Sequence, residues 1–391
     1  MPVSYFGENN HRNKSIRFGI AQADRLMHLY TIGKTGVGKT SLLETLALGD
    51  LAAGRGFALI DPHGDLAERM HEAAQRSGRR FVYLDAAQPG QPYGFNPLKR
   101  VREDKIPLAV SGLLDAMKKL WHDAWGVRME HVLRNSLYAL VERDGSTLPD
   151  VLRLYADKAF RKTVTGGIRN PVVRAYWHAE FAKYQDRQRA EAVAPVQNKL
   201  GGLLTDPRLY RALVDPETPI SFRQLMDEGG ILIANLAKGR LGADSADTLG
   251  SMMVATIAMA ALSRADQAEM SRRPFHLYVD EFQSFTTRAF AAMLPELRKY
   301  QVALVLANQY LGQLDEEVRK SVLGSVGTLV AFRIGPEDAA VLGRELQPTF
   351  EALDLFNLPN RRFYVKLMID GTPSKPFSGR TIDVGFWQGT D

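Results

Sequence analysis

The sequence predicts an α/β fold in which a mostly parallel central sheet is interrupted by an all-α helical insertion. Two observations support this fold class. Short apolar runs rich in β-branched residues alternate with helical stretches near the start of the chain and again in its second half, as in parallel βαβ units. Between these regions, a long stretch shows helical spacing, few β-branched runs and several Pro or Gly breaks.

The predicted elements follow in order along the chain. Between Met27 and Ala86 we expect strands and helices to alternate in the order MHLYTIG, SLLETLALGDLAAG, GFALID, LAERMHEAAQRSG and RFVYLDA. After GFNPL the character changes, and residues 105–215 are the predicted helical insertion. The alternation then resumes with the predicted strands ILIANL, FHLYVDE, VALVLANQ, TLVAFRI and FYVKLMI. We therefore expect one α/β domain in two parts, 1–104 and 216–391, with a helical domain between them.

The composition is typical of a soluble globular protein. The chain has 391 residues, of which 45% are hydrophobic and 24% charged, and it contains no cysteine, which excludes a disulfide framework and thiolate metal sites. Its first residues, MPVSYFGENNHR, lack the pattern of a secretory signal. The longest apolar stretch, Leu249 to Ser263, is shorter than the roughly 18 residues that span a bilayer. We interpret it as a buried core helix and expect a cytoplasmic protein without a membrane span.

The net charge of +6 is concentrated in one segment. Between Lys118 and Asp215 there are 17 Lys and Arg against 11 Asp and Glu, which accounts for the whole excess. A surface that follows a phosphate backbone needs such segregated positive charge, because neutralising a polyanion releases its counterions. A solvated helical face would give the same pattern. Charge alone leaves both interpretations open.

The stretch TIGKTGVGKTS has the spacing Gly-x-x-x-x-Gly-Lys-Thr between an apolar strand and an apolar-periodic helix, which is the context of a phosphate-binding P-loop. Its glycines allow backbone N–H groups to surround the β-phosphate of ATP, and the following helix adds its positive dipole end. Lys39 is predicted to reach the β- and γ-phosphates, and the Thr40 hydroxyl to bind Mg²⁺. The candidate nucleotide-binding residues are Gly33, Lys34, Thr35, Gly36, Val37, Gly38, Lys39, Thr40 and Ser41.

An acidic pair follows the apolar run FHLYV, which fits a buried central strand. Asp280 and Glu281 would then lie at the carboxyl end of that strand, the edge at which open α/β sheets bind ligands. We expect Asp280 to hold Mg²⁺ and Glu281 to orient and deprotonate the attacking water. The alternative is an acidic turn at a strand end, without chemistry.

A second predicted strand ends in Ala307, Asn308 and Gln309. An amide at this edge can hydrogen-bond both the γ-phosphate and the water, so Gln309 is a candidate sensor of hydrolysis. The alternative is that Gln309 only caps the following turn.

The stretch Asp61-Pro62-His63-Gly64-Asp65 closes another predicted strand. Its histidine and carboxylates suggest a metal site, but residues packed this closely in a Pro-Gly turn more often shape a loop and cap a helix. We interpret the stretch as a turn, with Asp65 as the N-cap of the next helix.

Several motifs together resemble one family. In chain order they are GKTGVGKTS, LIDPHGD, GFNPL, YVDEF, ANQ and FRIGPEDA, and this combination is similar to the FtsK/HerA superfamily of DNA-pumping ATPases. It is most similar to the DNA-binding ATPase domain of type IV secretion coupling proteins, the TraG/TraD kind. The likeness runs from about Ile16 to Lys375. It implies a RecA-like nucleotide-binding core that carries an all-α insertion and assembles as a homohexameric ring around DNA.

The resemblance also implies roles for single residues. Lys39 and Thr40 match the P-loop pair, Asp280 and Glu281 match the second motif, and Gln309 matches the sensor amide. In coupling proteins, an arginine on the helix after the acidic pair reaches into the site of the neighbouring subunit. Here Arg298, in LRKYQ, takes that place, and Arg333, in AFRIG, is the second candidate. A plain surface position on a helix is the alternative for Arg298.

The predicted function is that of an ATP-hydrolysing DNA translocase in conjugative transfer or DNA processing, with ATP and Mg²⁺ as cofactors. Partners from a secretion system, a relaxosome or a nuclease are expected. Two other functions stay open: a protein-secretion ATPase of a type IV system, and an ATPase subunit that partners a nuclease or defence effector. The chain departs from membrane-bound coupling proteins in that no transmembrane helices precede the ATPase motifs, so we expect either a soluble relative or a trimmed chain.

Overall fold

The computed structural model describes residues 3–11, 14–99, 101–121 and 125–388. Within these residues, eleven strands form one sheet in the order β2-β1-β15-β12-β11-β3-β10-β9-β4-β8-β5. The strands from β11 to β5 run parallel to one another. The parallel strands are β11 (Thr328–Ala331), β3 (Leu29–Ile32), β10 (Val302–Asn308), β9 (Phe275–Val279), β4 (Gly56–Asp61), β8 (Ile231–Asn235) and β5 (Val82–Asp85).

The remaining strands extend the sheet as an antiparallel wing. This wing joins both ends of the chain, because β1 pairs with β2 on one side and with β15 on the other. Its inner face is filled by phenylalanines, among them Phe6, Phe18 and Phe363, whose ring centroids lie 5.3–6.2 Å apart. The wing consists of β12 (Arg362–Lys366), β15 (Phe377–Thr381), β1 (Val3–His11) and β2 (Lys14–Ala21).

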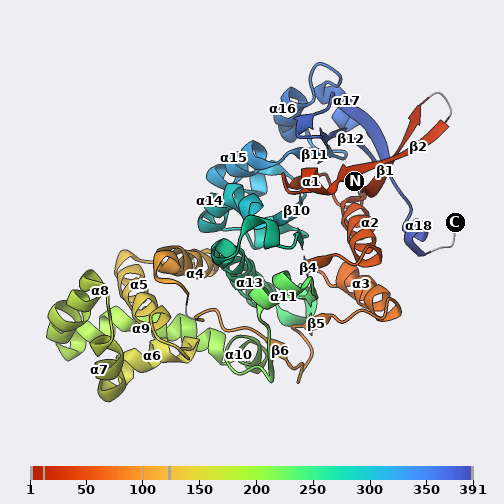
Figure 1. Ribbon diagram of the computed structural model, residues 1–391. Coiled ribbons are helices and arrows are strands. Elements are labelled where there is room, and N and C mark those ends of the chain that lie inside the picture. Colours follow the sequence, from red (N-terminus) through yellow and green to blue (C-terminus); the bar gives the residue numbers. More distant parts are fainter. Residues whose placement is uncertain (1–2, 12–13, 100, 122–124, 389–391) are drawn as a thin grey trace.

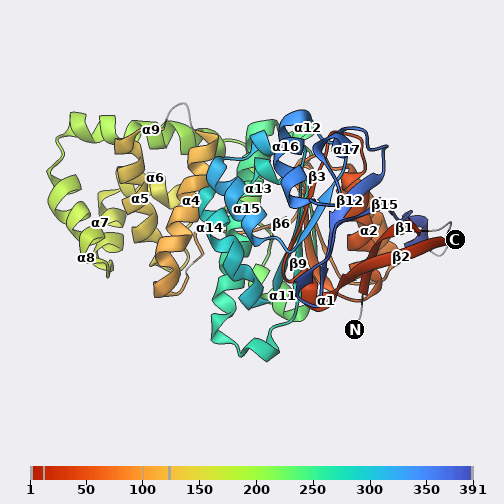
Figure 2. The ribbon, with the colours of Figure 1, turned by 90° about the horizontal axis from the view of Figure 1, so that it is seen from above.

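The parallel strands are mainly apolar because helices cover both faces of the sheet. Every residue of β3, β4, β9 and β10 is buried. On one face lie α2 (Lys39–Ala52) and α3 (Asp65–Arg76), and on the other lie α11 (Phe222–Glu228), α13 (Ala243–Ser263) and α14 (Arg288–Leu297), as Figures 1 and 2 show. The predicted α/β fold with a mostly parallel central sheet is confirmed.

Helix α13 contains the apolar stretch that the sequence predicts to be a core helix. It is long and apolar enough to meet a length-and-composition criterion for a membrane span, but 78% of its apolar window is buried within the protein. Gly250 on this helix lets the Phe285 ring approach closely, because a Cβ at position 250 would lie 2.4 Å from ring carbons. Helix α13 is therefore a core helix that packs against the loop after β9.

The helical segment begins after the short strand β6 (Tyr93–Gly94) and ends before β7 (Thr218–Pro219), which pairs with it. Its first helix, α4, contacts α13 and α14 as well as α5. Helices α5 to α9 extend away from the sheet (Figure 1), whereas α10 returns to contact β6 and α13. The segment comprises α4 (Ile106–Leu120), α5 (Val127–Val141), α6 (Leu148–Ala156), α7 (Lys158–Gly166), α8 (Pro171–Ala175), α9 (Asp186–Leu204) and α10 (Pro207–Leu213).

Short elements complete the α/β part. Strands β13 (Met368–Ile369) and β14 (Thr372–Pro373) form a small hairpin. The other helices are α1 (Gln22–Arg25), α12 (Lys238–Leu241), α15 (Glu316–Ser325), α16 (Pro336–Glu345), α17 (Ala352–Phe356) and α18 (Gly385–Gln388).

A buried ion pair joins α1 to α2 at the amino edge of the sheet. Arg25 donates to both carboxylate oxygens of Asp50, at 2.5 and 3.0 Å, and to the hydroxyl of Tyr278 on β9. The Tyr278 hydroxyl also donates to Asp50, and so does the Arg55 guanidinium at 3.1 Å. Burial alone would raise the pKa of Asp50, but the Arg25 charge, together with His276 and the hydrogen bonds from Arg25 and Tyr278, holds the pKa well below its usual range. The pair therefore fixes two helices against the central strands.

Removing one partner of this pair should destabilise the fold. Asp50→Ala is expected to lower the free energy of unfolding by about 3–5 kcal/mol, because the buried Arg25 guanidinium would lose its counter-charge. Urea unfolding followed by circular dichroism measures the change. Glu72→Ala, which breaks the exposed Arg76–Glu72 pair at 3.8 Å, is the control and should cost less than about 1 kcal/mol. Equal losses in the two variants would contradict the assigned role of burial.

Candidate nucleotide site

The site lies where three neighbouring parallel strands end. Strand β10 is paired in parallel with β3 on one side and with β9 on the other. The carboxyl ends of parallel strands meet at one edge of a sheet, which is where open α/β folds bind ligands. The P-loop follows β3, the acidic pair follows β9, and Gln309 follows β10. The register of the sheet therefore brings the three predicted motifs to one place.

The P-loop connects β3 to α2, and its backbone takes conformations that glycine allows. Gly36 and Gly38 have φ values of 75° and 119°, in the left-handed region that other residues rarely adopt. The Lys39 ammonium donates to the carbonyl oxygens of Gly33 (2.6 Å) and Lys34 (3.0 Å). Burial lowers the pKa of Lys39, and the nearby Glu281 and Asp280 oppose this shift. The lysine is thus folded back inside its own loop.

Thr40, the second residue of α2, contacts the acidic pair directly. Its hydroxyl donates to Asp280 Oδ2 at 3.0 Å. Asp280 is 3% exposed, and burial, with the negative charges of Asp61 and Glu281, raises its pKa to about 6. A hydroxyl and a carboxylate oxygen this close together can bind the same Mg²⁺, which prefers oxygen ligands. The donor chemistry therefore fits the predicted metal.

Glu281 links the acidic pair to Gln309. Its Oε1 accepts a hydrogen bond from Gln309 Nε2 at 3.0 Å, and its Oε2 accepts one from Gln283 Nε2 at 2.6 Å. Gln309 Oε1 in turn accepts from the Thr35 hydroxyl of the P-loop at 3.2 Å. Glu281 has a φ of 46°, which is uncommon for a residue with a side chain. Gln309 thus bridges the P-loop and the carboxylate predicted to activate water.

The two candidate arginines lie at opposite edges of the sheet. Arg298 is exposed, follows α14 and precedes β10, and its charge acts on His28, the residue before β3. It is therefore at the amino edge, away from the P-loop of its own chain. Arg333 follows β11, and its carbonyl oxygen accepts from the Lys34 N–H at 2.9 Å. Its guanidinium donates to Leu358 and Asn360, so Arg333 lies beside the P-loop.

The stretch after β4 forms a turn, but its helix cap differs from the prediction. Helix α3 begins at Asp65, and Gly64 occupies the N-cap position. Asp61 accepts hydrogen bonds from the N–H groups of His63 and Ala67, both at 2.9 Å. The prediction that Asp65 caps the helix was wrong. The left-handed conformation of Gly64 turns the chain so that Asp61 reaches the first helical turn.

A second group of polar residues beside the P-loop was missed by the sequence analysis. A cavity of about 660 Å³ lies next to Ser41. Its wall includes Arg361, whose backbone N–H donates to the Val37 carbonyl oxygen at 2.7 Å, and Arg380, which pairs with Glu8 at 2.7 Å. No local pattern could reveal these residues, because they come from the antiparallel wing, far from the P-loop in sequence.

The chain is similar in fold to solved structures of two proteins. For the bacterial conjugative coupling protein TrwBdeltaN70 in its unbound form, the TM-score is 0.64 at 18% identity, covering 94% of this chain and 87% of that one. For the plasmid coupling protein TrwB in complex with ADP and Mg²⁺, the TM-score is 0.62 at 18% identity, and the match covers 93% of this chain and 87% of that one. For VirB4 of Thermoanaerobacter pseudethanolicus, the TM-score is 0.66 at 13% identity, and the match covers 98% of this chain and 96% of that one. No protein-family model matches the sequence, and no curated protein matches it.

These likenesses extend over nearly the whole of both chains, helical segment included. At sequence identities of 18% and 13%, these similarities establish the fold of the chain and nothing about its activity. The RecA-like P-loop NTPase fold predicted for this chain is confirmed, and its fold is similar to the folds of a conjugative coupling protein and of VirB4. The chain has the fold shared by the conjugative coupling protein TrwB and by VirB4.

Proposed function

We propose that this chain is an ATP-hydrolysing DNA translocase that uses ATP and Mg²⁺ and works as a homohexameric ring around DNA. The observation that carries the proposal is the hydrogen-bonded connection between three strand ends. Thr40 contacts Asp280, and Gln309 joins Glu281 to Thr35 of the P-loop. The solved complex of TrwB with ADP and Mg²⁺, which has the same fold, supports the choice of cofactors.

Each residue of the site has a distinct proposed role. The backbone of residues 33–41 surrounds the phosphates, and Lys39 leaves the two loop carbonyls to contact the β- and γ-phosphates. Thr40 and Asp280 hold Mg²⁺, which when bound neutralises phosphate charge. Glu281 accepts a proton from the attacking water, and Gln309 orients that water against the γ-phosphate. The cavity beside Ser41 is large enough for a nucleoside.

The position of Arg298 supports a role between subunits. An exposed arginine at the amino edge of the sheet cannot reach the phosphates at the carboxyl edge of the same chain. In a ring, the same side chain is available to a neighbouring subunit, where it would neutralise charge on the transferring phosphoryl group. Arg333, already bonded to Leu358 and Asn360 beside its own P-loop, is the second candidate.

DNA is the proposed substrate of the motor, because the chain's positive excess lies in the helical segment (105–215 in the proposed domain division) and a basic surface attracts polyanions. A secretion-system, relaxosome or nuclease partner and a cytoplasmic location are part of the same proposal. A protein-secretion ATPase would use the same nucleotide site. Activation by nucleic acid distinguishes the two functions.

Glu281→Gln should keep ATP binding and lose turnover. The amide preserves size and hydrogen bonding but cannot accept the proton of water, so kcat should fall by about 100-fold or more. Steady-state ATPase assays and the binding of a fluorescent ATP analogue measure the two properties. Glu269→Gln, at an exposed position, is the control and should match the unmodified protein. Unchanged turnover in Glu281→Gln would remove this residue from the role of base.

Nucleic acid should activate the enzyme. The ATPase rate is expected to rise severalfold with duplex or single-stranded DNA, and binding should weaken steeply as salt increases, because each phosphate contact releases counterions. The Lys39→Ala variant, which lacks the P-loop lysine, gives the background ATPase rate that does not depend on this site. A rate that does not respond to any DNA tested, together with tight binding to a secretion component, would favour the protein-secretion function.

Mixed rings should reveal an arginine that acts between subunits. Arg298→Ala and Lys39→Ala proteins should each be nearly inactive, since a trans arginine is worth about 1,000-fold or more in rate. Mixing them creates interfaces where an intact P-loop faces an intact Arg298, so activity should reappear and depend on the mixing ratio. The same experiment with Arg333→Ala tests the second candidate. The absence of recovery at every ratio would contradict the trans role of Arg298.

A further inference from the structure

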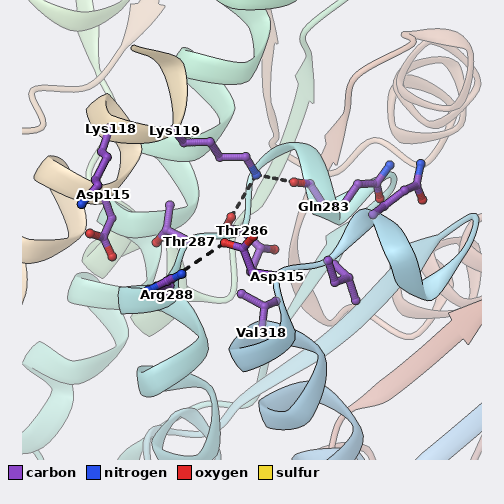
Figure 3. Close-up of a pocket in the computed structure, with 11 residues that line it drawn as sticks. Asp115, Lys118, Lys119, Gln283, Thr286, Thr287, Arg288, Asp315 and Val318 are labelled. Carbon is purple, nitrogen blue, oxygen red and sulfur yellow. Dashed lines mark hydrogen bonds and ion pairs between the residues drawn. The ribbon is translucent and has the colours of Figure 1, made fainter. Parts of the chain in front are cut away.

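The loop after the acidic pair is attached to the helical segment. The Lys119 ammonium, near the end of α4, donates to the carbonyl oxygens of Gln283 and, at 2.9 Å, Thr286. Figure 3 shows the side chain pointing into this loop. One helical turn earlier, Asp115 accepts a hydrogen bond from the backbone N–H of Ala289, the second residue of α14, at 2.8 Å. One face of α4 thus contacts the loop at both ends.

Lys119 lies at a cavity of about 410 Å³ that α4 forms with the loop and with the start of α15. Lys119 is an exposed residue as a whole, but burial around the ammonium lowers the pKa of Lys119 to about 8, while Asp247 and Asp315 oppose the shift. An ammonium removed from water needs acceptors, and the two loop carbonyls supply them. The neighbouring Lys118 is turned elsewhere and pairs with Glu130 at 3.5 Å.

The same loop holds the Glu281 carboxylate. Gln283 donates from its side-chain amide to Glu281 Oε2 at 2.6 Å, while Gln309 donates to Oε1. Gln283 Oε1 is buried and has no hydrogen-bond partner among the described residues. Among the described residues, the side-chain amide of Gln283 therefore makes its hydrogen bond to Glu281 and to no other group.

The loop is stiff enough to transmit a displacement. Phe285 packs onto α13 at Gly250, and the Thr286 hydroxyl donates to the Phe282 carbonyl oxygen at 2.7 Å. Glu281, at the start of the loop, has a positive φ, a conformation that persists only where its surroundings enforce it. Lys119 contacts Gln283 and Thr286, whereas Glu281 follows Asp280, whose N–H donates to the Ile60 carbonyl oxygen of β4. A shift of α4 would therefore move Gln283 relative to the Glu281 carboxylate and weaken their hydrogen bond.

We propose that Gln283 is a positioning residue that restrains the Glu281 carboxylate in the DNA-free enzyme, and that Lys119 ties this restraint to the helical segment. The proposal rests on the proposed function of Glu281 as the base. An amide on each oxygen holds the carboxylate in one orientation, so rotation toward a water outside that orientation requires one amide to leave. Gln309 is needed at the γ-phosphate, so Gln283 is the restraint that α4 can release when the helical segment binds DNA.

The proposal predicts faster, not slower, hydrolysis when the restraint is removed. Gln283→Ala and Gln283→Asn, whose amide is one methylene too short, should each raise the DNA-free kcat about threefold or more, with the KM for ATP changed by less than about twofold. The stimulation by DNA should fall by the same factor, because the DNA-free state is already released. A purely structural defect would lower kcat or raise KM instead.

Lys119 variants test the link to α4. Lys119→Met keeps the stem and removes both hydrogen bonds, so it should also raise the DNA-free kcat, whereas Lys119→Arg can still donate to both carbonyls and should stay near the unmodified rate. Lys118→Met is the matched control, because Lys118 lies beside it on α4 and pairs with Glu130. Its DNA-free rate should not change.

The result that overturns the proposal is a DNA-free kcat in Gln283→Ala and Gln283→Asn that equals or falls below that of the unmodified enzyme. An increase in both Gln283 variants without one in Lys119→Met would overturn the link to α4. These outcomes differ from a failure of the proposed function, in which the unmodified protein itself shows no ATPase activity or no response to DNA. Should one Gln283 variant fail to fold, the other gives the same measurement.

Discussion

The parallel pairing of β3, β10 and β9 is the constraint on which the rest of the site depends. Val305 of β10 lies opposite both Leu29 of β3 and Tyr278 of β9, so the loops that follow the three strands leave the sheet side by side. Buried polar groups are costly unless they are hydrogen-bonded. Here the two partners of each hydrogen bond follow different strands, since Thr40 after β3 meets Asp280 after β9, and Glu281 after β9 meets Gln309 after β10.

Much of this site could be predicted because its signals are local. A continuously apolar run such as VALVLAN indicates a strand buried on both faces, and the chemistry follows directly at its end. In the antiparallel wing, β12 was predicted within FYVKLMI, but β1, β2 and β15 gave no comparable signal. Strands β1 and β15 pair across nearly the whole chain, and β15, with the sequence FSGRT, is largely polar. For the same reason Arg361, which contacts Val37 through its backbone, could not be found by inspecting the P-loop.

Two residue roles depend on backbone conformation and tertiary packing, which a sequence pattern does not show. They are the cap of the helix after β4 and the contact of Lys119 with the loop after β9. Asp61 and Asp65 are both acidic residues before a helix, and only the backbone turn at Gly64 decides that Asp61 supplies the cap. Lys118 and Lys119 are adjacent lysines that look equivalent in sequence. Tertiary packing sends Lys119 into the loop after β9 and Lys118 toward Glu130. Helix α4 therefore contacts the loop after β9 directly, even though it is the first helix of the helical segment.

The antiparallel wing has a consequence for how the protein is made. Strand β1 lies between β2 and β15, and its pairing with β15 joins Gly7 to Thr381. A growing chain emerges amino end first, so the inner edge of β1 stays without its partner until β15 (Phe377–Thr381) has been synthesised. An open strand edge is a template for association with other chains. Nascent chains on neighbouring ribosomes would therefore need this edge to be shielded, for instance by a chaperone, until β15 arrives.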